Sequence, residues 1–210
     1  MLRRVLIGAA ALAVLTSAAG LLAYLARDRN PAEPEADSTG SGSASAAPTP
    51  APATGVGMAV PTPPRTSDPI EFAKAATKAL WTYDARSGSQ EAHVDGLKRW
   101  MTSEKKYVDW PSVNQQVPSP LLWSRMHDNG QHAGAEVAEG HFPASFKSAL
   151  ARDPGAITTA YVYAVTVTGR QSLAWAGSGA GAEARSITVA VQCRPETNCS
   201  LAGVLPSVAP

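Results

Sequence analysis

The feature that most constrains this chain is a run of 22 residues without a charge, Val5–Ala26, which follows directly on Arg3 and Arg4. At ~1.5 Å per residue a helix of this length spans ~33 Å, enough to cross the ~30 Å hydrocarbon core of a bilayer. Tyr24 stands near the end of the run, where aromatic side chains favour the membrane interface. The run therefore predicts a transmembrane anchor at 5–26, preceded by a short tip at 1–4.

A cleaved signal peptide is the alternative for this segment. Such a peptide has an apolar run of only ~7–15 residues before a small-x-small cleavage site, and Ser17-Ala18-Ala19 can serve as that site. The apolar run continues through Leu21 and Leu25, which favours an uncleaved anchor. Arg27 and Arg29 on the far side leave only a weak charge bias, so the flanking charges do not set the orientation of the anchor.

The next segment, 27–67, is predicted to be a disordered linker. Within 31–64, 28 of the 34 residues are Pro, Ala, Gly, Ser or Thr, and no aromatic residue occurs between Tyr24 and Phe72. Such a composition cannot bury enough apolar surface to offset the entropy lost on ordering. We expect the linker to hold the following domain roughly 30 Å or more from the membrane.

A single folded domain is expected at 68–210. This part contains every Phe, every Trp and both cysteines, and it is long enough to bury a sizeable core. It carries 13 basic and 13 acidic residues. Because nucleic-acid binders normally show a clear basic excess, this balance argues against direct contact with nucleic acid.

The first half of the domain carries helix signals. Asp68–Glu71 has the spacing of a capping box, with proline in the first turn. An apolar stripe then repeats at helical steps: Phe72, Ala76, Leu80 and Tyr83. Two further helices are expected, one with His93 or Val94, Leu97 and Met101 on a face beside Trp100, and one from Ser119-Pro120 to Asn129-Gly130 containing Leu121, Leu122 and Met126.

The second half favours strands. Alternating or β-branched runs occur at Gln131–Glu139, Ile157–Thr168, Gln171–Ala176, Ile187–Gln192 and Leu201–Leu205. We expect a turn at Gly169-Arg170, a loop at Gly177–Gly181, and a short helix or covering loop around Phe142–Leu150. Helices followed by strands indicate an α+β fold, with about three helices packed on a curved antiparallel sheet of about four or five strands.

Cys193 and Cys199 join the last two predicted strands with five residues between them. A hairpin can bring two such thiols within bonding distance, so we predict a disulfide. Two free buried thiols, or half of a metal site, are the alternatives, although a metal needs further ligands. A disulfide indicates an oxidising compartment, which would place the domain outside the cytoplasm and the N-terminus inside.

No catalytic, metal or cofactor signature stands out in the sequence, and we assign no catalytic residue, no metal site and no cofactor. Asp84 and Asp109 are single carboxylates, which a helix-and-sheet cone can use with a Tyr for proton abstraction. Lys98, Arg99, Lys105 and Lys106 form a small basic cluster. That cluster is either a solvated face or a contact for anionic lipid or an acidic partner.

Three segments resemble membrane-anchored proteins of the nuclear transport factor 2-like superfamily: Asp68–Arg86, Val117–Met126 and Ala160–Cys193. Within that superfamily the chain is similar to actinobacterial proteins encoded with plasmid and integrative-element transfer functions. The resemblance covers most of 68–210 and includes no catalytic motif. It implies a single-pass subunit of a conjugative, type IV secretion-like apparatus in the bacterial cell membrane, whose extracytoplasmic cone binds other subunits and self-associates.

Two other functions share this layout. One is a membrane-anchored accessory protein of a lipid-import system. The other is a small-molecule pocket enzyme of the isomerase or dehydratase type. The leading hypothesis is a non-enzymatic assembly subunit, because an anchor, a spacer and a neutral domain are the features that the sequence presents.

Overall fold

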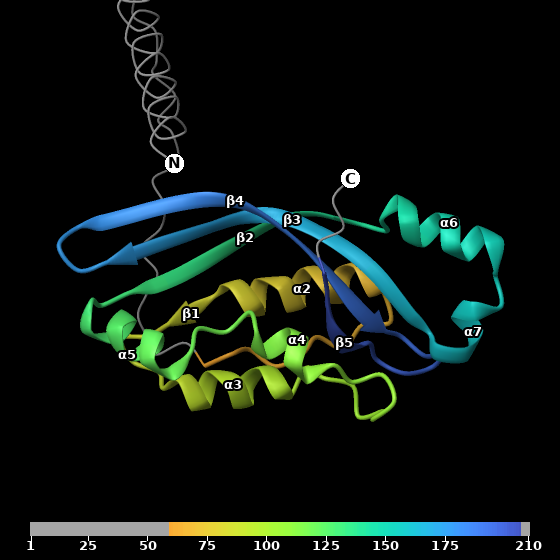
Figure 1. Ribbon diagram of the computed structural model, residues 1–210, viewed down its shortest axis with the longest axis horizontal. Coiled ribbons are helices and arrows are strands. Elements are labelled where there is room, and N and C mark those ends of the chain that lie inside the picture. The colour runs from red at the N-terminus through yellow and green to blue at the C-terminus, as the bar shows by residue number, and fades with distance from the viewer. Residues whose placement is uncertain (1–58, 207–210) are drawn as a thin grey trace, which may run out of the picture. The chain divides into compact units, whose positions relative to one another are not determined.

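The computed structural model describes residues 59–206, so the predicted anchor and most of the predicted linker lie outside the described residues. The elements in chain order are α2 (Pro69–Trp81), β1 (Tyr83–Asp84), α3 (Gln90–Lys98), α4 (Trp110–Asn114), α5 (Pro120–Asp128), β2 (His132–His141), α6 (Ala144–Arg152), α7 (Ala156–Ala160), β3 (Val162–Trp175), β4 (Gly179–Gln192) and β5 (Ser200–Leu205). The strands form one curled antiparallel sheet in the order β1-β2-β3-β4-β5, and α2 packs on one face of it (Figure 1). This confirms the α+β class. No helix within 59–206 has both the length and the apolar character needed to cross a bilayer.

Helix α2 begins where the sequence predicts. The side chain of Asp68 accepts hydrogen bonds from the backbone N–H groups of Ile70 and Glu71 at 2.7 and 3.1 Å, with Pro69 in the first turn. The cap differs from the expected box in one respect, because Glu71 does not bond back to the backbone of Asp68. The Thr66 hydroxyl stands between them, accepting from the Asp68 N–H at 3.1 Å and donating to the Glu71 carboxylate at 3.3 Å.

The core lies between α2 and the sheet. Phe72 and Trp81 of α2 are at most 2% exposed, and the rings of Phe72 and Trp100 lie 5.6 Å apart. The inward positions of the two longest strands are fully buried valines: Val165, Val167, Val189 and Val191. Val165 and Val167 thus lie on one face of β3, with the less buried Thr166 between them, as the strand-like composition of this run predicts. Tyr83 leaves the predicted helical stripe, since it forms β1 and pairs with Ala133 of β2.

The expected turn at Gly169-Arg170 is wrong, because β3 runs through it without interruption and pairs Gly169 with Arg185 of β4. Gly169 instead allows β2 and the Trp81 ring to approach β3 closely. A Cβ at this position would collide with the carbonyl oxygen of Glu136 and lie 3.2 Å from the ring of Trp81. The chain reverses later, at Ala176–Ser178, where Gly177 has a φ of +76°.

The start of the predicted strand Ile157–Thr168 is also wrong. Residues 156–160 form the short helix α7, and Tyr161, at a φ of +53°, ends it before β3 begins at Val162. The preceding Asp153-Pro154-Gly155 turn favours this start, since the Thr158 hydroxyl donates to the Gly155 carbonyl at 2.7 Å. The β-branched composition of the segment therefore does not decide its local structure; the Thr158 hydroxyl bonds to a carbonyl one turn earlier, and α7 has no side-chain cap. Helix α6 confirms the expected short helix around Phe142–Leu150.

The α3 and α5 helices are present, with a different burial pattern in α5. Trp123 and Met126 are its buried residues, whereas Leu121 and Leu122 are 66% and 49% exposed. Gly130, at a φ of +61°, follows the C-cap Asn129 as expected. A further short helix, α4, was not foreseen; the Asp109 carboxylate caps it by accepting from the Ser112 N–H at 3.3 Å.

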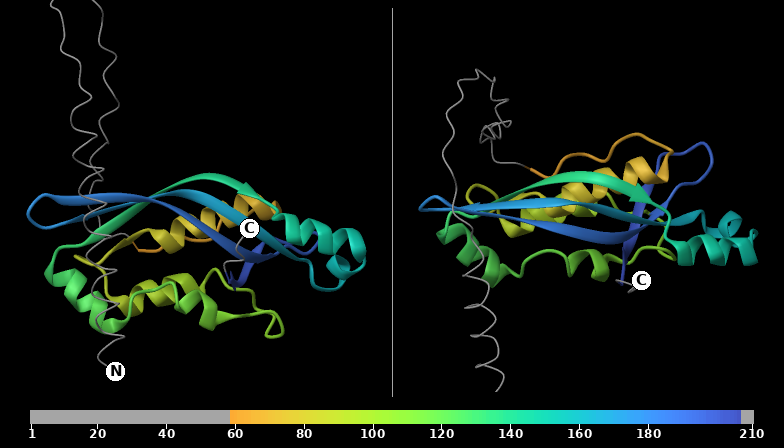
Figure 2. Two further views of the ribbon diagram at one scale, coloured as in Figure 1. Left: turned by 45° about the horizontal axis from the view of Figure 1, so that its top comes forward. Right: turned by 90° about the horizontal axis from the view of Figure 1, so that it is seen from above.

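Residues 59–67, here called the strap, lie against the domain although they belong to the predicted linker. Val60 is 6% exposed and packs on Gly96 of α3. The Arg99 guanidinium donates to the Val60 carbonyl at 3.1 Å, and the Trp100 indole donates to the Pro61 carbonyl at 3.0 Å. The strap runs alongside α2 in the view from above (Figure 2). The composition of the strap would not order it by itself. Two side chains that bond to its backbone therefore help to hold it on the domain.

Replacing Gly96 with alanine should loosen the strap. The added Cβ would lie 2.5 Å from the Cβ of Val60, so one of the two must move. We expect the free energy of unfolding to fall by ~1–2 kcal/mol, since overpacking outweighs the better helix propensity of alanine. Trypsin should also cleave faster after the exposed Arg65.

Gly134→Ala is the matched control, because a Cβ on Gly134 would meet nothing within 4 Å. Equal stability and equal cleavage rates for the two variants, measured by denaturant unfolding and timed proteolysis, would show that Val60 does not depend on Gly96.

Candidate functional site

The two cysteines form the predicted disulfide. Their Cα atoms lie 4.2 Å apart, between the end of β4 and the start of β5, and both side chains are buried. The Cys193 N–H donates to the Tyr161 carbonyl at 2.9 Å, and the Cys199 N–H donates to the Thr66 carbonyl at 2.7 Å. The disulfide therefore joins three parts of the chain: the end of α7, the strap and the terminal hairpin.

The predicted basic cluster divides between the end of α3 and the turn that follows. Lys98 pairs with Asp95 at 3.0 Å, and Arg99 bonds to the strap. Lys105 and Lys106 are exposed on the turn, where the ammonium of Lys106 lies 5.4 Å from the Tyr107 ring. Half of the cluster thus makes contacts within the domain, and the other half faces solvent.

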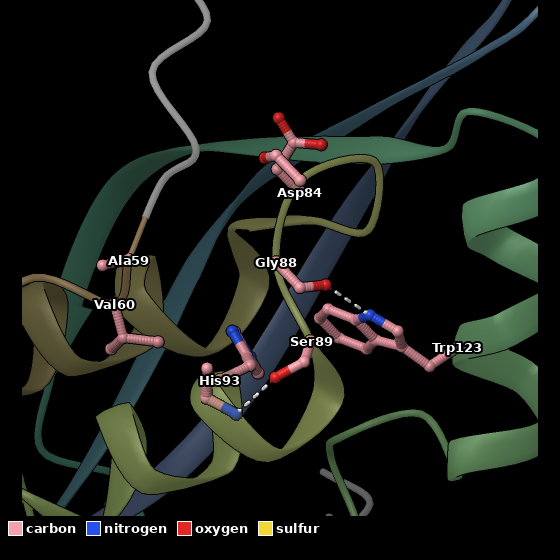
Figure 3. A pocket seen from close by; sticks show the side chains of 9 residues that line it. Ala59, Val60, Asp84, Gly88, Ser89, His93 and Trp123 are labelled. Atoms are coloured by element: carbon pink, nitrogen blue, oxygen red, sulfur yellow. Dashed lines mark hydrogen bonds between the residues drawn. The ribbon is translucent and has the colours of Figure 1, made fainter.

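A pocket of about 240 Å³ lies beside Ala59 and Val60, at the start of the described residues (Figure 3). The strap, the turn after β1, α3 and α5 each contribute to its wall. The lining residues are Ala59, Val60, Asp84, Ser87, Gly88, Ser89, Ala92, His93 and Trp123.

His93 and Trp123 form the inner wall of this pocket. The Trp123 indole donates to the Gly88 carbonyl at 2.9 Å, and its ring lies 5.2 Å from the ring of His93. His93 is 7% exposed, so its ring is almost wholly removed from water. Because burial disfavours the imidazolium, the pKa of His93 is lowered to about 4, so the ring is neutral at pH 7.

Asp84 supplies the acidic group of the pocket. The Arg86 guanidinium donates to its two carboxylate oxygens at 2.8 and 2.7 Å, and the Arg86 N–H adds a third bond at 3.0 Å. These bonds lower the pKa of Asp84 below its usual value. The carboxylate is consequently ionised and already neutralised by its partner.

These two groups suit binding better than proton transfer. A general acid or base works best when its pKa lies near the working pH. His93 is held neutral and Asp84 is held ionised, both well away from that condition. Asp109, the other candidate carboxylate, caps α4. Within residues 59–206, no group of three or more His, Cys, Asp or Glu side chains is placed to hold a metal ion.

A second candidate site is the distal half of the β3–β4 hairpin. Strand β5 pairs only with Thr188–Gln192 of β4, which leaves Gly179–Ser186 without a neighbour on that side among the described residues. The hairpin extends well past the end of β5 (Figure 1). Trp175 at its tip is 44% exposed.

The sequence reasoning missed the pocket and the open strand edge for different reasons. The stripe predicted around α3 placed His93 or Val94 on a buried face, and Trp123 stands three residues before Met126, which is the helical spacing of a shared face. The open edge had no comparable signal, because it depends on where β5 stops.

Comparisons of the chain with family models, with curated proteins and with solved structures find no match.

Removing the disulfide should destabilise the domain. Closing so short a loop constrains the unfolded chain by an amount worth ~2 kcal/mol. We expect Cys193→Ser and Cys199→Ser each to lower the free energy of unfolding by about that much, and the double variant to lose no more than either single one. A reductant should destabilise the wild type and leave the double variant unchanged. Additive losses would contradict this account.

Acid should destabilise the domain through His93. The unfolded chain binds a proton on this residue below pH ~6.5, whereas the folded domain resists it down to about pH 4. The free energy of unfolding should therefore fall as the pH drops from ~6.5 to ~4, by up to ~3 kcal/mol. Denaturant unfolding across this range measures the effect.

His93→Gln should flatten the stability profile between pH 4 and 6.5, while the exposed control His127→Gln should not. A His93→Gln profile that parallels the wild type would show that another group carries the acid sensitivity.

Proposed function

We propose that this protein is a non-enzymatic, membrane-anchored assembly subunit associated with a conjugative, type IV secretion-like DNA-transfer apparatus. In this proposal the domain lies outside the cytoplasm of a bacterial cell and binds other protein subunits. The observation that carries the binding role is the open edge of β4 at Gly179–Ser186. The resemblance described above supports the choice of apparatus.

An open strand edge is a ready site for protein contact. Its unpaired backbone N–H and C=O groups can bond to a strand from another chain. Natural edges are commonly protected by charged side chains, lysine above all, by proline or by a bulge. Gly179–Ser186 contains no lysine and no proline, and the register shift of β4 lies further on, between Ala190 and Val191; Glu183 and Arg185 are its charged residues.

The pocket supports binding rather than catalysis. Asp84 is engaged by Arg86, and the pKa of His93 is too low for efficient proton transfer near neutral pH. The equal numbers of acidic and basic residues in 68–210 favour a protein partner over nucleic acid. A pocket enzyme of the isomerase or dehydratase type is therefore the weaker candidate.

A lipid-import accessory role is the second candidate, and one observation favours it. A groove of about 400 Å³ lies between the strap and α2, with a largely apolar lining that includes Val60, Pro61, Ala75, Ala79 and Trp100. Such a groove can accept an acyl chain.

Affinity purification of the full chain from native membranes tests the proposal. We expect the tagged chain, extracted in detergent, to co-purify with subunits encoded by transfer genes, and an untagged strain to yield none. Deleting the gene should lower the transfer frequency of the element, with recovery on complementation. Unchanged transfer would refute the proposed apparatus, and phospholipid retained in place of protein partners would favour the lipid-import role.

A further inference from the structure

The geometry points to a defined interface for self-association: the open edge of β4 pairs antiparallel with the same edge of a second copy of this chain, centred on Ala184. This inference deepens the proposed function, because it names one partner of the assembly subunit, a copy of itself. It concerns residues 182–186, all of which lie within the unpaired part of β4.

The charge pattern of this edge is self-complementary. Glu183 and Arg185 stand two residues apart on the face of the sheet that α2 covers, and they are the charged residues of Gly179–Ser186. Antiparallel pairing about Ala184 places Glu183 of each copy opposite Arg185 of the other. Opposite charges directly across two strands are favourable, and like charges are not. Glu183 and Arg185 lie 3.6 Å apart within one chain, so a second copy adds a further opposite charge to each of them, which a neutral strand would not.

Arg185 already has partners within its own chain, on the side of β4 that faces β3. Its guanidinium donates to the Gln171 side chain at 2.5 Å and lies 5.3 Å from the ring of Trp81. Its Nε lies 3.6 Å from the carboxylate of Glu183, whose side chain is 60% exposed. Gln171 and Trp81 therefore hold the arginine, while Glu183, although it pairs with Arg185, is exposed enough to meet a partner strand as well.

The opposite face of the edge permits close approach. Ala182, Ala184 and Ser186 point away from α2 and are exposed. Small side chains there leave no obstacle to a strand ~4.8 Å away. In this register Ala182 faces Ser186 of the second copy, and Ala184 faces itself.

The extent of β5 sets the length of the interface. Leu205 already occupies the position beside Thr188. Pairing about Ala184 would bring Ala180 of the second copy to that same position, so the two strands must separate before it. The interface therefore contains the five pairs formed by Ala182–Ser186, which predicts a modest, concentration-dependent association.

Disulfide trapping of the full chain tests the register. Pairing about Ala184 brings the two Cβ atoms of this residue to within ~5.5 Å of each other, so Ala184→Cys should form a cross-linked dimer under mild oxidation. Ser172→Cys is the matched control, since Ser172 is exposed on the same face but lies one strand inward, opposite Ala182. Non-reducing gel electrophoresis of oxidised native membranes reads both. Absence of the Ala184→Cys dimer, or equal trapping of the control, would overturn the inference.

Charge reversal tests the partner. Glu183→Arg should reduce trapping of Ala184→Cys, because it creates arginine pairs across the axis. Mixing it with Arg185→Glu in the same Ala184→Cys background should restore a dimer of the two variants, since each charge then meets its opposite. Glu139→Arg is the control, because Glu139 is an exposed residue of β2, away from the β4 edge. It should leave trapping unchanged.

The two proposals can fail separately. A Glu183→Arg chain that still co-purifies with transfer subunits but no longer dimerises would support both. Unaltered dimerisation of Glu183→Arg would refute this interface and leave the assembly role standing. Dimers without any transfer subunit would refute the apparatus and leave this interface standing.

Discussion

The packing of Trp81 over Gly169 organises much of this domain. Because position 169 has no side chain, the last turn of α2 approaches the middle of β3 closely enough for the indole to lie on the sheet. The amide of Gln171, two residues along, donates to the Trp81 carbonyl at 2.6 Å. These contacts join the end of the helix to the middle of β3, at the position where Gly169 pairs with Arg185 of β4.

The charged end of the β3–β4 hairpin depends on this arrangement. Arg185 lies over the same indole and bonds to the same Gln171, so the core positions a surface cation. Without the continuous β3, the hairpin would not extend past β5, and β4 would not present an open edge. The surface from which we infer self-association is therefore a consequence of how the core packs.

The strap and the disulfide tie the opposite end of the domain together. Thr66 connects the cap of α2 to Cys199, and Arg99 and Trp100 bond to the backbone of the strap. The pocket beside the strap includes a neutral imidazole and a neutralised carboxylate. The pocket lies near the tip of the β3–β4 hairpin, since Asp84 pairs with His132 and His132 with Ala174. Its carboxylate is bonded to Arg86 and its imidazole is neutral, which is why an assembly role is the better proposal.

The sequence alone determined those features that depend on neighbours along the chain. The Asp68 cap, the part of the α2 stripe from Phe72 to Leu80 and the Cys193–Cys199 pair all follow from spacings of a few residues, and the structure confirms each of them. Tertiary packing alone decided the rest. Gly169 has the same local signature whether it turns the chain or admits an indole, and the strap is held by contacts with residues far along the chain, among them Arg99, Trp100 and Cys199. The open edge of β4 exists because β5 ends opposite Thr188, and such pairings across the sheet leave no periodic trace in the sequence.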